Sequence, residues 1–194
     1  MPSKKYTTPI REGRVFHIFN RGINHQDVFL CDEDKKCFLN RVRKYLSDYA
    51  DILAYSILDN HYHILVRIKE GNDPSSCFSK QFAKLILSYT YYYNRKYGHS
   101  GPIFHRCFKR LEVNTQDYLR KVFWYVNANP AHHNSAADYR NYGFSSLACY
   151  LGGKPDGLTS HSLVAEIFGS RRSLLDFLEG SHDVLSLGIL TMEG

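Results

Sequence analysis

The sequence predicts an α+β fold based on a four-stranded antiparallel sheet with two helices on one face. Strand-like segments rich in β-branched and aromatic residues alternate with segments whose apolar residues recur at helical spacing. Their order is strand, helix, strand, strand, helix, strand, helix. The first six elements match the split β-α-β arrangement of a ferredoxin-like (RRM-like) sheet, whose second face is open. We expect the seventh element to lie across that face.

The four strands are expected at 14–20, 52–58, 61–68 and 108–113. Asn20-Arg21-Gly22 interrupts the first of them. Asp59-Asn60 is a candidate two-residue turn, so the second and third strands should form an antiparallel hairpin.

Three helices follow from their start and stop signals. Asp32 can cap a helix that runs to about Tyr49, and Asp73-Pro74 is a good start for one that runs to about Lys96. Thr115 can cap the third helix. It should end near Asn129, because the following proline disfavours helical geometry at the residue before it.

The length of 194 residues suits one domain with an extension. We expect the domain to span residues 1–150, beginning with a loose polar arm over 1–12. Residues 152–157 resemble a linker, and short helices at 162–168 and 173–178 would form a C-terminal helical extension over 151–194.

Composition narrows the class of protein. Hydrophobic residues make up 43% of the chain, but no apolar run approaches the ~18 residues that span a bilayer, and no secretory signal is recognisable. We therefore expect a cytoplasmic protein. The five cysteines are odd in number and lack C-x-x-C spacing, which favours reduced thiols over disulfides or zinc. The net charge of +6 favours a polyanionic partner, and aromatic rings can stack on unpaired bases.

A histidine pair opens the third strand. Residues two apart on a strand share a face, so His61 and His63 should point the same way, about 7 Å apart along the chain. Two imidazoles can bind a divalent metal and leave positions open for substrate. With ten histidines in the chain, an H-x-H pair also arises without such a role.

The third helix carries a stripe formed by Tyr118, Val122, Tyr125 and Asn129. Tyr125 can be a core residue or a reactive phenol, and its position alone does not distinguish the two. Basic residues near this part of the sequence could contact phosphates and make binding depend on salt. The candidate DNA-binding residues are Arg21, Arg106, Lys109, Arg110, Arg120 and Lys121.

Five segments in order resemble the single-tyrosine transposases of the HUH endonuclease superfamily, and especially the REP-associated tyrosine transposases. The resemblance runs from about Val15 to Tyr150. The segments are FHIFNRG (16–22), LDNHYHILV (58–66), YYYNRKYGHSGPIFHRCFKR (91–110), YVNANP (125–130) and DYRNYGFSSLACY (138–150).

This resemblance implies a reaction. Tyr125 matches the nucleophile that cleaves single-stranded, hairpin-containing DNA through a 5′-phosphotyrosine, which a second strand end can reverse. His61 and His63 match the ligands of Mg²⁺ or Mn²⁺, and Asn129 stands where relatives have a polar third ligand, often glutamine. The sequence AHHN at 131–134 replaces the usual small and basic residues, which bears on DNA specificity.

Two alternatives belong to other classes of function. A non-catalytic nucleic-acid-binding module would stack bases on aromatic side chains of the sheet. A phosphoesterase would use His61 and His63 directly as acid and base, and would be insensitive to EDTA. The family includes monomers as well as dimers that share sites between subunits, so a homodimer is also a possibility.

Overall fold

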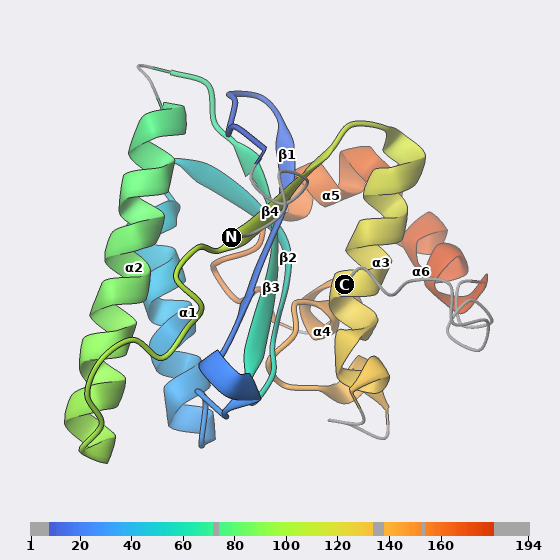
Figure 1. Cartoon of the computed structure of the whole chain (residues 1–194). Helices are drawn as coiled ribbons and strands as arrows, with labels where there is room; N and C mark the ends of the chain where they lie inside the picture. The colour runs from blue at the N-terminus through green and yellow to red at the C-terminus, as the bar shows by residue number, and fades with distance from the viewer. Residues whose placement is uncertain (1–7, 72–73, 134–137, 153, 181–194) are drawn as a thin grey trace.

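The computed structural model describes residues 8–71, 74–133, 138–152 and 154–180 (Figure 1). Its centre is a four-stranded antiparallel sheet with the strand order β2-β3-β1-β4. This order is the ferredoxin-like one that the sequence predicts. The strands are β1 (Val15–Arg21), β2 (Ala50–Ile57), β3 (His61–Ile68) and β4 (Lys109–Val113).

Three long helices cover the sheet from two sides. Helices α1 (Asp32–Leu46) and α2 (Pro74–Tyr97) lie on one face, and α3 (Gln116–His132) crosses the other, mainly over β2 and β3 (Figure 1). Each face has its own hydrophobic core. Tyr62, Ile64 and Val66 belong to the core under α1 and α2, whereas Leu65 belongs to the core under α3. The predicted three-layer arrangement is confirmed.

Shorter elements complete the described chain. They are η2 (Ile23–His25), η3 (Tyr139–Asn141), α4 (Leu147–Tyr150), α5 (His161–Phe168) and α6 (Arg171–Gly180). Apolar residues of α5 and α6 share the hydrophobic core of α3. The two predicted C-terminal helices are therefore present, and they pack on the helix that carries Tyr125.

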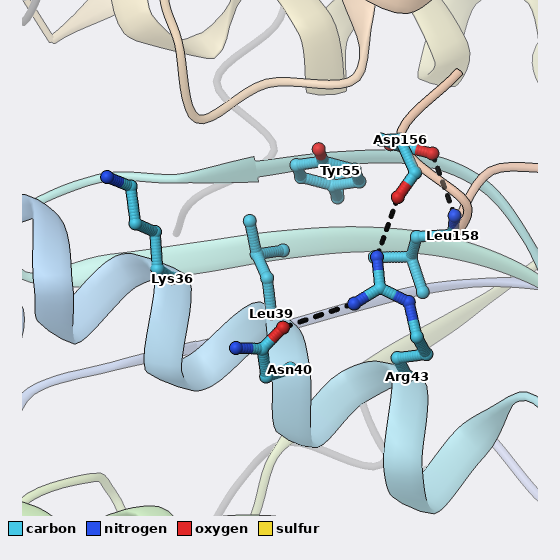
Figure 2. Close-up of a pocket in the computed structure, with 7 residues that line it drawn as sticks. All are labelled: Lys36, Leu39, Asn40, Arg43, Tyr55, Asp156 and Leu158. Carbon is cyan, nitrogen blue, oxygen red and sulfur yellow. Dashed lines mark hydrogen bonds between the residues drawn. The ribbon is translucent and has the colours of Figure 1, made fainter. Parts of the chain in front are cut away.

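The predicted linker is held against α1 by hydrogen bonds. The Arg43 guanidinium donates to the Asp156 carbonyl at 2.6 Å (Figure 2). It also donates to the Gly157 carbonyl at 3.3 Å. The Asp156 carboxylate in turn accepts from the backbone N–H groups of Leu158 and Thr159. A pocket of about 300 Å³ lies beside these contacts. Residues 154–157 of the predicted linker are thus anchored to α1.

Several predicted boundaries differ from the structure. The residue before α1 is Cys31 rather than Asp32, and the Asp34 carboxylate accepts from the Cys31 and Leu30 N–H groups, so the first turn is capped from inside the helix. The same helix ends at Leu46, three residues early. The predicted cap at Asp73 lies outside the described residues.

The end of α3 is a second correction. The Thr115 hydroxyl caps its start by accepting from the Tyr118 N–H, as predicted. The helix then continues through Pro130 to His132 instead of ending near Asn129. A proline removes one helical hydrogen bond but does not forbid a final turn, and packing on the sheet keeps this one helical.

Candidate active site

The two histidines of β3 face α3, as the alternation predicts. Their side chains are buried, and the ring centroids of His61 and His63 lie 5.2 Å apart with the ring planes at 87°. Their neighbours Tyr62 and Ile64 point into the opposite core. The strand therefore presents two imidazoles together on the face that α3 crosses.

Helix α3 brings a phenol and an amide to these imidazoles. The Tyr125 ring meets the His63 ring edge-on, with centroids 5.5 Å apart. One helical turn later, the Asn129 Oδ1 lies 3.1 Å from the His61 Nε2. Residues four apart share a helix face, so one face of α3 supplies both groups. All four side chains come from a single chain and are almost fully buried.

A third histidine belongs to the same cluster. His17 of β1 is fully buried, and its Nε2 lies 2.9 Å from the His63 Nδ1. Its ring also meets the Tyr125 ring edge-on at 5.9 Å. We did not single out His17 from the sequence, although the F-H-I-F alternation in 16–19 already put it on the face opposite Phe16 and Ile18.

Two atoms of the cluster have the spacing of neighbouring ligands of a divalent metal. Neighbouring ligands of a six-coordinate ion with bonds of about 2.1 Å lie roughly 3 Å apart, close to the 3.1 Å between His61 Nε2 and Asn129 Oδ1. The Asn129 Nδ2 is buried without a hydrogen-bond partner among the described residues, so nothing else there fixes this amide. No group of three or more His, Cys, Asp or Glu in the described ranges could hold a metal, and Asn129 is the candidate third ligand from the sequence.

Two more histidines border the cluster at the end of α3. The His133 ring lies 4.4 Å from the His61 ring, and the His132 ring lies 5.6 Å from the Tyr125 ring. Both residues are exposed. The sequence AHHN that we noted for its departure from relatives thus borders the candidate site, although its Asn134 is outside the described residues.

Two of the predicted DNA-binding cations share the face of the histidines. Arg21 pairs with His61 across β1 and β3, and Lys109 pairs with Phe19, which itself pairs with His63. Directly paired residues of a sheet point to the same face. The Lys109 Nζ lies 5.6 Å from the centre of the Phe19 ring. Arg106 is exposed in the loop before β4.

Other predicted cations are directed elsewhere. Arg110 pairs with Ile18 of the opposite core, its Nε donates to the Thr8 carbonyl at 2.6 Å, and burial lowers its pKa. Arg120 donates to the Ile167 carbonyl at 2.9 and 3.2 Å, which ties α3 to α5. Lys121 is exposed on α3. The structure therefore does not gather all six cations around Tyr125.

Two expectations from composition concern membrane-spanning helices and the state of the cysteines. None of the helices described there has the length and apolarity needed to cross a membrane. All five cysteines are free thiols.

Comparison with solved structures identifies the fold. The chain superposes on the structure of a REP-associated tyrosine transposase bound to a REP hairpin, with a TM-score of 0.57. The fold is that of a REP-associated tyrosine transposase. The superposition covers 81% of this chain and 88% of the transposase, at 20% sequence identity. No known sequence family matches the chain, and neither does any curated protein. The resemblance inferred from the five motifs is confirmed for the fold.

Proposed function

We propose that this protein is a transposase-type DNA strand transferase that cleaves and rejoins single-stranded DNA containing a hairpin. Tyr125 is the nucleophile, and His61, His63 and Asn129 hold a divalent metal, Mg²⁺ or Mn²⁺. The similar solved structure is a tyrosine transposase bound to a REP hairpin. That likeness supports a hairpin substrate, and the positive net charge of +6 agrees with a polyanionic partner.

One observation carries the proposal. The Tyr125 ring lies 5.5 Å from the ring of His63, and Asn129 approaches His61 from the same helix. A phenol and a candidate metal site thus occupy adjoining positions in one chain. The contact of Tyr125 with two histidines of separate strands supports a role for its phenol beyond packing.

The chemistry follows from these groups. The Tyr125 Oη attacks the scissile phosphorus, the bond from phosphorus to the 3′ oxygen breaks, and a 5′-phosphotyrosine forms. The phenolic proton is released and the departing oxygen gains one, so the products are the adduct and a free 3′-hydroxyl. A 3′-hydroxyl of another strand end reverses the same steps and joins the DNA. A bound divalent metal would offset the charge of the phosphate.

The test is a denaturing gel of labelled hairpin-containing single-stranded DNA incubated with the protein and Mn²⁺. We expect a slowly migrating protein–DNA adduct that disappears with Tyr125→Phe and with EDTA. Tyr91→Phe is the control, because Tyr91 is exposed on α2, on the other face of the sheet; it should leave the adduct unchanged. An adduct that persists in Tyr125→Phe would refute the assignment of the nucleophile.

A binding module without catalysis is the second candidate. The Tyr125 side chain is only 3% exposed, which is the one observation that favours it. This reading requires salt-sensitive DNA binding that is equal in the wild type and Tyr125→Phe, with no adduct on any hairpin tested. Cleavage of the DNA that survives EDTA and leaves no adduct would instead support the metal-free phosphoesterase.

A further inference from the structure

Helix α3 is joined to β2 through one buried serine. The Ser146 Oγ accepts from the Tyr55 N–H of β2 at 3.0 Å and lies 2.8 Å from the Asn127 Oδ1 of α3. Ser146 and Asn127 are both fully buried. The serine hydroxyl is therefore a link between an outer strand of the sheet and the helix that carries Tyr125.

The direction of each hydrogen bond in this link is fixed by the groups that form it. The Asn127 Nδ2 lies 3.0 Å from the Phe123 carbonyl, which only accepts, so the amide presents its oxygen to Ser146. An amide oxygen also only accepts, so the Ser146 hydroxyl is the donor. The bonds then run from the Tyr55 N–H through Ser146 to Asn127 and on to Phe123, and each donor has an acceptor.

Ser146 is itself held in place on β2. Its backbone N–H donates to the Tyr55 carbonyl at 3.0 Å, so its backbone and its side chain both bond to the same residue of the strand. At the end of α4, the Tyr150 hydroxyl donates to the Leu53 carbonyl at 2.7 Å. The serine thus holds α3 from a fixed point on the outer strand.

The link meets α3 on the face opposite its candidate functional groups. At about 100° per residue, Asn127 stands about 160° around the helix from both Tyr125 and Asn129. A bond on that side fixes the rotation of α3 about its axis. A group about 6 Å from the axis moves by about 1 Å when the helix rotates by about 10°. A misplacement of that size costs on the order of 100-fold in rate.

We propose that Ser146 and Asn127 are positioning residues that set the rotation of α3 and so place the Tyr125 phenol for attack on the DNA. This inference rests on the proposed function for its consequence, although the link is a property of the fold. Both residues act through Tyr125 rather than on the phosphate itself.

Asn127→Leu is the main test, because it removes the link without leaving a buried polar side chain unpaired. The Ser146 hydroxyl can then donate to the Tyr55 carbonyl, 3.5 Å away, and leucine favours a helix more than asparagine does. We expect a wild-type midpoint of urea unfolding and wild-type affinity for the labelled hairpin, but about 10–100-fold slower formation of the adduct at saturating DNA. A role in stability alone predicts no loss of rate in this variant.

Ser146→Ala is the second variant, and Ser145→Ala is its matched control. Ser146→Ala removes the donor to Asn127 and should slow adduct formation to a similar extent. Ser145 is also buried, but its hydroxyl donates within its own turn, to the Tyr142 carbonyl at 3.3 Å. Ser145→Ala should therefore keep the wild-type rate. Adduct formation at the wild-type rate in Asn127→Leu or in Ser146→Ala would overturn the inference.

The rotation of α3 also has a readout that does not depend on catalysis. Trp124 is the single tryptophan of the chain, and it lies beside Tyr125 on α3 with 2% of its surface exposed. We expect its emission maximum to shift in Asn127→Leu and in Ser146→Ala, and not in Ser145→Ala. If the wild type forms no adduct, the proposed function fails. The shifted emission would then still support the link, and unchanged emission in both variants would refute it.

Discussion

Lys109→Gln should weaken DNA binding and Arg120→Gln should not, although the sequence marks both residues as candidate phosphate contacts. Lys109 lies on the sheet face of the histidines, beside Phe19. The Arg120 guanidinium donates hydrogen bonds to the Ile167 carbonyl, and its central carbon lies 5.8 Å from the centre of the Phe168 ring. We therefore expect Lys109 to contribute to DNA binding, and Arg120 to hold α5 on α3.

The two substitutions should change different quantities: the salt dependence of DNA binding for Lys109, and the free energy of unfolding for Arg120. One lost phosphate contact makes the slope of log K against log salt shallower by about 0.7 for single strands and about 0.9 for duplex. Lys109→Gln should show this change, and Lys109→Arg should not. Arg120→Gln should keep the wild-type slope but lower the free energy of unfolding by about 1 kcal/mol, since a hydrogen-bonded partner is lost.

The assay is fluorescence anisotropy of a labelled hairpin at several KCl concentrations, combined with urea unfolding of each variant. The reasoning fails if Arg120→Gln flattens the salt slope as much as Lys109→Gln does. It also fails if Lys109→Gln leaves the slope unchanged, because the face of the histidines would then not be where the backbone of the DNA runs.

Asp34→Asn should remove a pH-dependent part of the stability: burial raises the pKa of Asp34, but hydrogen bonds from Lys96, Tyr97 and Tyr92 outweigh it and lower the pKa to about 2. A carboxyl group with a depressed pKa stabilises the fold above about pH 4, and this contribution disappears as the pH falls toward 2. The free energy of unfolding of the wild type should therefore fall by about 1–2 kcal/mol over that range, after allowance for solvent screening, and that of the variant should fall by less. Urea unfolding at each pH measures this difference. Asn129→Ala should weaken Mn²⁺ binding by more than about 10-fold relative to Asn129→Asp, because a carboxylate is the stronger oxygen ligand; a titration that ranks them equally would remove Asn129 from the metal site.

Much of the fold was predictable because the signals were local and repeated. The alternation of HYHILVRI fixes which side chains share a face, and the strand occupies the predicted residues 61–68. The same alternation brought His61 and His63 together. The spacing of Tyr125 and Asn129 put both on one helix face, and the structure brings that face to the histidines.

Other features depend on long-range contacts that the sequence does not display. Whether Arg110 faces the site depends on the register of β4 against β1, which pairs it with Ile18 and turns it away. Arg120 forms a hydrogen bond with Ile167 of α5, which lies 47 residues later in the chain. His17 joins the cluster only because β1 lies beside β3. Pro130 is tolerated near the end of α3 because burial on the sheet outweighs one missing hydrogen bond.

The position of α3 also bears on whether the proposed strand transfer needs a partner subunit. Tyr125 meets His63 of its own chain at 5.5 Å between ring centroids, so each chain holds a phenol and both imidazoles. A site shared between subunits would instead separate the tyrosine from its histidines within one chain. We therefore expect that mixing Tyr125→Phe with His63→Ala does not restore the protein–DNA adduct, and that adduct yield per chain is independent of protein concentration. Tyr125→Phe retains its histidines and His63→Ala retains its tyrosine, so any shared site would be rebuilt in the mixture. An adduct on the His63→Ala chain in the presence of Tyr125→Phe would show that Tyr125 of one chain attacks a phosphate held at the histidines of the other, and the single-chain site would be wrong.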